Sequence, residues 1–283
     1  MIDKLLIAFS ETDPFSKKVF EKFVQEKNLR KLAQIRNVEI YETSEGVKIL
    51  YDKNNDLPFI DYLEELRKEV NQISTIEYVI CVSRHEMKNP RPLLTVHTSG
   101  NWAKAEYGGI DEKVSKANAR LNCNILRFLK KLAEERNILE KYGISLEATH
   151  HGPSLDMFVT FVEVGSTMEE WLDEKCHKLF VDLVNYIIEN FESLLQGSSK
   201  VYSVVGDLHY STLVSHVLNN EYDVGHIVPK YVKPSRKNIV DSIERTFPRP
   251  DGVIIHWKSV DKETRELVTS IVTEFGLELI KRK

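Results

Sequence analysis

Short hydrophobic runs alternate along the chain with longer stretches whose apolar residues follow helical spacing. The runs predict strands at residues 5–9, 38–41, 47–51, 78–82, 93–102, 147–151, 157–164, 201–205, 223–227 and 253–257. Helical spacing covers residues 14–34, 60–73, 111–142, 168–195 and 262–275. This alternation is typical of a three-layer α/β domain, in which helices flank a mixed, mostly parallel sheet.

Three of the runs refine this picture. Residues 78–82 are apolar on both faces, which predicts a central strand covered by helices on each side. Residues 38–41 and 47–51 lie around Gly46 and predict a β-hairpin. Because no Gly/Ser/Pro-rich linker interrupts the pattern, we expect residues 1–283 to form a single domain.

Composition narrows the class of protein. A chain of 283 residues buries enough surface to fold without disulfides or structural metals. Its three cysteines show no paired spacing, which is typical of a reducing cytoplasm and gives no zinc-finger pattern. The first apolar run is too short for a signal peptide and no run approaches membrane-spanning length, so we expect a soluble cytoplasmic protein. The net charge of -4 argues against a general nucleic-acid coat, although a local basic patch is compatible with it.

Residues 146–167 carry two adjacent histidines, His150 and His151, where a strand opens into a Gly-Pro turn. Strand alternation places Glu147 and His151 on one side and His150 on the other. A buried carboxylate beside an imidazole is costly unless it binds, orients or exchanges protons with something. A lone histidine is more often structural, but the adjacent pair favours a functional site.

Other histidines follow the same pattern at the ends of predicted strands. They are His85 after residues 78–82, His97, His209 and His226. Imidazoles that gather at several strand ends are typical of a metal or hydrolytic site. No HExxH or CxxC motif fixes a metal site.

Four segments together carry a family resemblance: SRHEMKNPRPLLTVHTSGNWAKAEYGG, EATHHGPSLDMFVTFVEVGSTMEEW, GDLHY and GHIVPKY. In this order and at these separations, they resemble the archaeal and plant type of D-aminoacyl-tRNA deacylase. The resemblance implies a cytoplasmic, monomeric esterase that removes D-amino acids from mischarged tRNA and uses zinc. It also implies a fold similar to that of peptidyl-tRNA hydrolases and nucleoside phosphorylases.

The chain departs from the family pattern at two places. Asp207 and Leu208 precede His209 where members carry a glycine-rich Gly-Gly-x-His-Tyr, and Glu86 follows His85 where members carry serine. The first change removes backbone freedom near a ligand, and the second adds a carboxylate to the expected site. The rim of this site is therefore expected to differ from that of relatives.

Hydrolysis of the ester needs an attacking water, a base or a metal that deprotonates it, and donors for the oxyanion. For the zinc that the resemblance implies, we expect the ligands His97, His151 and His209, with His85 and His226 in reserve. Glu147 is expected to orient His151 or to act as the general base. In a metal-free variant, His150 or His151 is the base.

Three alternatives stay open at this point. Ser99 or Ser154 beside a histidine would give a serine-type esterase, although no GxSxG motif occurs. A non-catalytic tRNA- or nucleotide-binding module would leave the histidines as structural residues. A nucleoside phosphorylase-like enzyme would need a glycine-rich phosphate loop, and the sequence has none.

A basic run fits either the deacylase or the binding module, because phosphate contacts supply affinity without reading bases. Its residues are Lys230, Lys233, Arg236, Lys237, Arg245 and Arg249. We expect the first four to contact tRNA.

Overall fold

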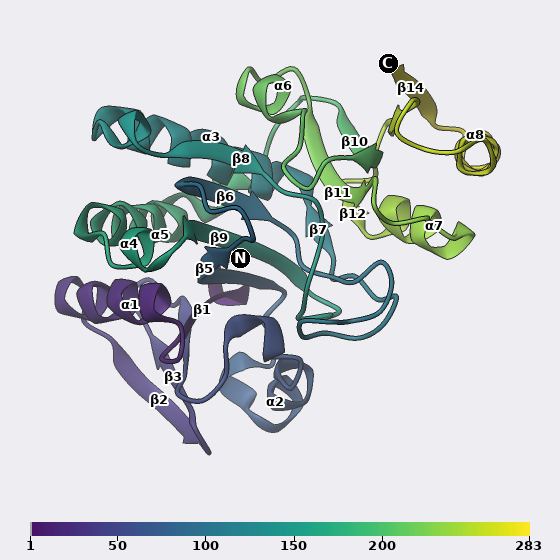
Figure 1. Ribbon diagram of the computed structural model, residues 1–283. Coiled ribbons are helices and arrows are strands. Elements are labelled where there is room, and N and C mark those ends of the chain that lie inside the picture. The colour runs from purple at the N-terminus through teal and green to yellow at the C-terminus, as the bar shows by residue number, and fades with distance from the viewer. Residues whose placement is uncertain (1) are drawn as a thin grey trace.

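The computed structural model describes residues 2–283, which form an α/β structure with two main sheets (Figure 1). The larger sheet is mixed: parallel pairing joins β4, β1, β5 and β9 at its centre, and antiparallel pairing joins β2 to β3, β3 to β4 and β9 to β6. Its strands are, in spatial order, β2 (Arg30–Ile35), β3 (Val38–Glu42), β4 (Lys48–Asp52), β1 (Leu5–Ser10), β5 (Tyr78–Glu86), β9 (Phe158–Ser166), β6 (Leu93–His97) and β8 (Gly143–Leu146).

Helices cover both faces of this sheet because its central strands are apolar on both sides. Leu5, Ile7 and Phe9 of β1 pack in one hydrophobic cluster, and the alternate residues Leu6 and Ala8 pack in another. The first cluster joins α1 (Pro14–Glu26), α3 (Ala119–Glu135) and α5 (Glu174–Leu194), and the second joins α2 (Leu63–Glu69). The expected α/β class, a mostly parallel mixed sheet flanked by helices, is confirmed.

The smaller sheet has four parallel strands, a feature that the sequence pattern did not reveal as a separate sheet. Helix α3 packs against β11 as well as β6, so it joins the two sheets. The strands are β11 (Asp223–Pro229), β10 (Val201–Asp207), β13 (Gly252–His256) and β14 (Glu278–Arg282). The remaining elements are α4 (Met168–Trp171), α6 (Val214–Leu218), α7 (Arg236–Glu244), α8 (Lys262–Glu274), the paired β7 (Ala117–Asn118) and β12 (Thr246–Phe247), and the 3-10 turns Ile2–Lys4, Leu57–Phe59, Asn71–Ile73 and Ile138–Glu140.

Four predicted helices were too long. The helix expected at residues 60–73 covers only Leu63–Glu69, and a 3-10 turn follows at Asn71–Ile73. The other three differ for local reasons. The helix expected at residues 14–34 ends at Glu26, because Arg30–Ile35 pairs with β3 as an edge strand. The helix expected at 111–142 begins at Ala119, where the Asn118 side chain caps Leu121 N. The helix expected at 168–195 is divided before Glu174, where Asp173 caps α5. Within residues 2–283, no helix is both long and apolar enough to cross a membrane.

Candidate active site

Three adjacent strands of the larger sheet place His85, Glu163 and His97 on one face. Glu163 of β9 lies beside Ser83 on β5 and Thr95 on β6, and each histidine is two residues further along its own strand. Residues two apart share a face, so both imidazoles flank the carboxylate. Because β6 runs antiparallel to β9, the site lies on the sheet face rather than at a common carboxyl edge.

The segment after β8 connects the two sheets. Its backbone donates from Glu147 N to Val96 O at 3.1 Å, from Ala148 N to His209 O at 2.8 Å and from Thr149 N to Ile227 O at 3.1 Å. Strand β8 ends at Leu146, so these residues are held by isolated bridges and not by a regular strand.

This irregular backbone makes the predicted alternation of Glu147, His150 and His151 wrong. His151 has a φ of 41°, in the left-handed region that residues other than glycine seldom adopt. The His150 and His151 rings lie on the same side, with centroids 4.4 Å apart, and Glu147 Oε2 is 3.6 Å from His150 Nε2. At the next residue, a Cβ on Gly152 would lie 2.2 Å from the Gly109 nitrogen and the Pro58 oxygen, so glycine is needed there.

Five of the expected histidines surround two buried carboxylates. Glu147 lies 3.5 Å from His85 Nδ1, 3.6 Å from His150 Nε2 and 3.2 Å from His209 Nε2. The second carboxylate, Glu163, lies 3.4 Å from His85 Nδ1, 3.4 Å from His97 Nε2 and 4.0 Å from His151 Nε2. The structure thus unites residues from β5, β6, β9 and two loops.

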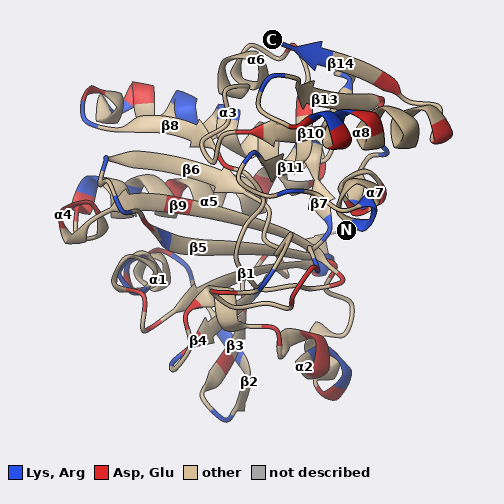
Figure 2. Ribbon diagram, turned by 45° about the vertical axis from the view of Figure 1, so that its right-hand side comes forward, with Lys and Arg blue, Asp and Glu red and all other residues tan. Residues whose placement is uncertain are grey.

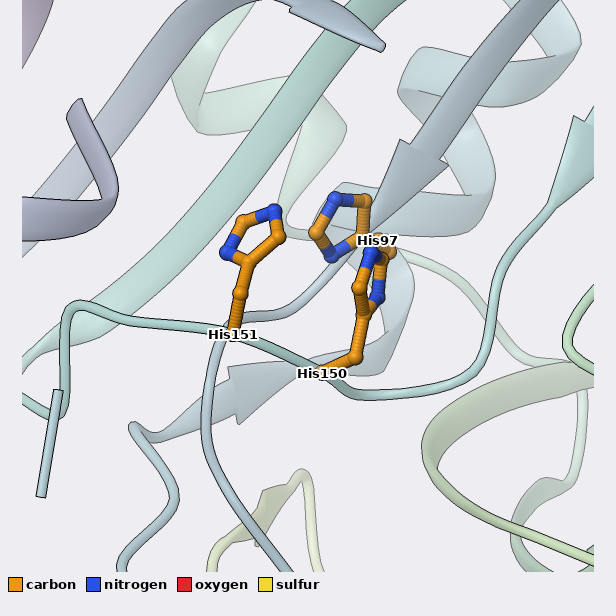
Figure 3. Close-up of side chains that lie close together, drawn as sticks. All are labelled: His97, His150 and His151. Carbon is orange, nitrogen blue, oxygen red and sulfur yellow. The ribbon is translucent and has the colours of Figure 1, made fainter. Parts of the chain in front are cut away.

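Backbone carbonyls fix the tautomers of three of these imidazoles. His97 Nδ1 is 3.3 Å from Thr98 O, His150 Nδ1 is 2.8 Å from Ala148 O, and His151 Nδ1 is 2.6 Å from Gly152 O. A carbonyl only accepts, so each Nδ1 carries the proton and the neutral ring keeps its lone pair on Nε2. One ring nitrogen from each residue lies within 4.8 Å of the others, and Figure 3 shows the three rings side by side.

Burial and charge separate the protonation states of the cluster. Burial disfavours the imidazolium of His85, yet Glu147 and Glu163 outweigh it and raise the pKa of His85 to about 9. His97 behaves alike: burial is outweighed by Glu163 and its pKa is raised. Burial and the His97 charge lower the pKa of His151 to about 4 and that of His150 well below its ordinary value. His150 and His151 are therefore neutral donors at pH 7.

The two carboxylates are held as anions against the effect of burial. Burial alone would raise their pKa values, but neighbouring imidazoles outweigh it. His85 and His209 lower the pKa of Glu147, and His85 and His97 lower the pKa of Glu163. Both oxygens of Glu147, Glu163 Oε2 and His97 Nε2 are buried without a hydrogen-bond partner. Buried polar atoms without partners are costly, and a cation bound among them would satisfy them.

The sequence-predicted ligands divide between two groups of potential metal donors. His97 and His151 lie together with His150, whereas His209 lies with His85 and Glu147. His226 lies outside both groups: its Nδ1 is 2.9 Å from Thr149 Oγ1 and its Nε2 is 3.1 Å from Ser115 O. The His226 imidazole thus stabilises the loop after β8 through Thr149 and does not face the cluster.

Neither candidate serine faces an imidazole. Ser99 Oγ donates to Pro153 O at 2.7 Å and Ser154 Oγ donates to Lys113 O at 2.9 Å. Both serines are buried, and within residues 2–283 neither hydroxyl is hydrogen-bonded to a histidine. The geometry does not favour the serine-type esterase.

Sequence reasoning missed Glu163. This residue interrupts the otherwise apolar run of β9 and is buried with a 2% exposed fraction. A glutamate inside an apolar strand is seldom buried unless it is paired, and this was the available signal.

The two departures from the family pattern have different surroundings. The Asp207 carboxylate accepts from Leu208 N, Ser211 Oγ and Thr212 Oγ1 at 2.7 to 2.9 Å, and so closes the turn that carries His209. Glu86 instead lines a cavity beside the histidines. The first change stabilises a loop, and the second alters the wall of the site.

Two cavities meet at the His150–His151 pair. One, the acidic cavity, has a volume of about 300 Å³ and is lined by Asp13, Asp56, Arg84, His85, Glu86 and Glu163, among others. The other, the aromatic cavity, has a volume of about 380 Å³ and includes Trp102, Tyr107 and Tyr231 in its wall. Tyr107, His150 and His151 line both, so a ligand extending from one cavity to the other would pass the imidazoles.

Three of the four expected tRNA-binding residues form ion pairs close to the second sheet. Lys233 lies 2.6 Å from Glu263, Arg236 lies 2.6 Å from Glu274 and Lys237 lies 2.6 Å from Asp241. Figure 2 shows basic and acidic residues interspersed on α7 and α8. All three basic side chains are more than half exposed, and such surface pairs are weak enough for a phosphate to compete.

Curated proteins of known family are similar to this chain over most of its length. A D-aminoacyl-tRNA deacylase from Caldivirga maquilingensis is 38% identical over 256 residues, covering 90% of this chain and 93% of the relative. Another from Thermococcus onnurineus is 31% identical over 281 residues, covering 98% and 99%.

Among solved structures, a crystal structure described as a conserved protein of unknown function superposes with a TM-score of 0.83 at 24% identity, covering 98% of this chain and 94% of that one. A purine nucleoside phosphorylase from Toxoplasma gondii reaches a TM-score of only 0.43 at 10% identity over 68% of this chain and 92% of that one, a likeness too weak to bear on the fold. The family model described as D-aminoacyl-tRNA deacylase matches residues 73–280, a range that holds the complete cluster. The chain belongs to the D-aminoacyl-tRNA deacylase family, whose members are hydrolases of ester bonds.

Proposed function

We propose that this protein hydrolyses the ester of D-aminoacyl-tRNA to release the D-amino acid and tRNA. The observation that carries the proposal is the cluster of five imidazoles and two anionic carboxylates, placed where two cavities meet. Family membership supports an ester as the substrate and argues against a non-catalytic binding module. We further propose that residues 1–283 act as one domain and, as the family resemblance implies, as a cytoplasmic monomer.

The donor set fits the zinc that the family resemblance implies. His97, His150 and His151 would hold the ion through Nε2, because their Nδ1 atoms face backbone carbonyls. Three imidazoles with a remaining open position are typical of catalytic zinc, and His97, whose pKa is raised by Glu163, would release its Nε2 proton when the metal binds. When bound, zinc supplies a Lewis acid for the ester carbonyl and lowers the pKa of water. The group of His85, Glu147 and His209 is a second potential site.

The two carboxylates have different roles in this proposal. Glu163 lines the acidic cavity, so it is the carboxylate placed to take the proton of an attacking water. Glu147 has imidazoles within 3.6 Å on three sides and orients His85, His150 and His209. Water adds to the ester carbonyl carbon, the bond to the ribose oxygen breaks, and the proton passes to that oxygen.

The experiment that tests the function compares the D- and L-enantiomers of the amino acid on the same tRNA. We expect release of D-tyrosine from tRNA to be at least about 100-fold faster than release of L-tyrosine, because a site that engages the ammonium, the ester and the side chain together accepts only one hand. Initial rates with the same tRNA measure this ratio. Equal rates, or release of neither, would remove the deacylase assignment.

The basic run gives a separate prediction about tRNA affinity. Changing Lys233, Arg236 and Lys237 together to Ala is expected to raise KM about three- to tenfold with little change in kcat, because phosphate contacts add affinity without entering the chemistry. The slope of affinity against salt should fall by about one for each phosphate that the variant no longer neutralises.

A matched control changes Lys18, Lys131 and Lys178, which are exposed on α1, α3 and α5, and should keep the wild-type KM. A basic-run variant with unchanged KM and salt slope would place the tRNA elsewhere. Arg84, Lys88, Arg91 and Lys104 are the next basic residues to test.

A further inference from the structure

The two cavities on either side of the His150–His151 pair lead to an inference that rests on the proposed function. An ester that lies at the imidazoles must send its acyl part to one side and its ribose to the other. We propose that the acidic cavity holds the amino acid, with its ammonium group on Glu86, and that the aromatic cavity holds the terminal adenosine of the tRNA.

Charge assigns the acidic cavity to the amino acid. Four carboxylates line it, from Asp13, Asp56, Glu86 and Glu163, against two cations, the Arg84 guanidinium and the His85 imidazolium. An excess of carboxylates attracts an ammonium group and repels the phosphates that accompany a nucleotide.

Elimination among those carboxylates leaves Glu86. Asp56 Oδ2 lies 2.8 Å from Arg84 Nη2, which offsets both charges. The buried Asp13 caps α1 and accepts from Ser83 Oγ and Arg84 N.

Glu163 belongs to the imidazole cluster. Glu86 is exposed at the end of β5 and has no salt-bridge partner within 4.0 Å among residues 2–283. It is the carboxylate available to the ligand.

Aromatic rings assign the other cavity to the base. Trp102 is buried in its wall with Nε1 donating to Ile227 O at 3.1 Å, so the indole is fixed. Tyr107 and Tyr231 are 46% and 62% exposed, which is unusual for large side chains and leaves their rings free to stack. Lys104 and Glu106 in the same wall offset each other in charge. Nucleobases are uncharged and stack on such rings whatever the identity of the base.

The course of the chain agrees with this orientation. Pro229, Tyr231 and Val232 line the aromatic cavity, and the basic run continues from them through Lys233 to Lys237. A tRNA with its terminal base in this cavity would bring the preceding phosphates toward the basic run. The reverse orientation would direct those phosphates toward the acidic cavity.

The test measures binding of two probes, adenosine monophosphate and D-tyrosinol, which carries the ammonium group without a carboxylate. NMR titration of the full chain gives both affinities without any turnover, so the result is independent of whether D-tyrosyl-tRNA is hydrolysed. We expect Tyr231→Ala to weaken adenosine monophosphate about tenfold and to leave D-tyrosinol unchanged. Glu86→Gln should weaken D-tyrosinol about fivefold and leave adenosine monophosphate unchanged.

Matched variants control for indirect effects. Tyr231 Oη lies 3.2 Å from His209 Nδ1, so Tyr231→Phe separates stacking from that contact and is expected to keep the nucleotide affinity. Phe247→Ala and Glu140→Gln, which are outside both cavities, should bind both probes as wild type does. Four results would each overturn the proposal. Tyr231→Ala could weaken D-tyrosinol while Glu86→Gln weakens adenosine monophosphate, or the wild type could fail to bind the nucleotide. Either variant could also weaken both probes equally, or Tyr231→Phe could lose nucleotide affinity.

Discussion

His97→Ala and His151→Ala are each expected to lose bound zinc and ester hydrolysis together while the chain stays folded. His97 Nε2 and His151 Nε2 both lie within 4.0 Å of the Glu163 carboxylate, and removing one of three ligands opens the donor set. Losing a Lewis acid that contributes several kcal/mol corresponds to a fall in kcat on the order of 10³-fold. Elemental analysis, single-turnover hydrolysis and circular dichroism on the same samples measure the three properties.

The control is His216→Ala, which removes a partly exposed histidine on α6 that pairs with Glu221 away from the cluster. It should keep both metal and activity. If the His97 and His151 variants retain zinc, or lose zinc without losing activity, the ion is not held for catalysis by these residues.

Glu163→Gln is expected to lower kcat by about 10²- to 10⁴-fold while keeping the metal, because it removes the base and preserves the side-chain volume. Glu147→Gln should instead cost about 10- to 100-fold and weaken metal binding, because its carboxylate orients the imidazoles. The pair is matched: both side chains are 2% exposed or less and both contact imidazoles. Rates under saturating substrate and zinc affinity separate the two roles.

Sequence reasoning expected Glu147 as a possible base, and the opposite result would favour it. A larger fall in kcat for Glu147→Gln with metal retained would exchange the two assignments. A wild-type rate for Glu163→Gln would show that Glu163 is not the general base, whichever other residue has that role.

The alternation of apolar and polar residues was sufficient to predict the α/β class and most strands, because the buried central strands leave strong periodic patterns. It also singled out the histidines, since imidazoles at several strand ends are unusual. Five of the six gather in space. His226 does not, because both its ring nitrogens are used by Thr149 and Ser115, partners that lie far away in sequence.

Other features depend on contacts that no local pattern records. The position of His150 beside His151 follows from the left-handed φ of His151, where regular alternation no longer applies. Glu163 was missed because its partners come from β5 and β6, and a sequence does not reveal the order in which strands pair. The lengths of three helices were set by caps and by an edge strand, which override helical spacing.

Exhaustive chelation followed by zinc addition decides whether hydrolysis depends on a bound metal. The purified chain should contain zinc by elemental analysis, lose hydrolysis of D-tyrosyl-tRNA as the metal is removed, and regain it when zinc is restored. The His97, His150 and His151 imidazoles would then hold the ion on which hydrolysis depends. Full hydrolytic activity in a sample shown to be free of metal would contradict this account and leave the imidazoles and Glu163 to act alone.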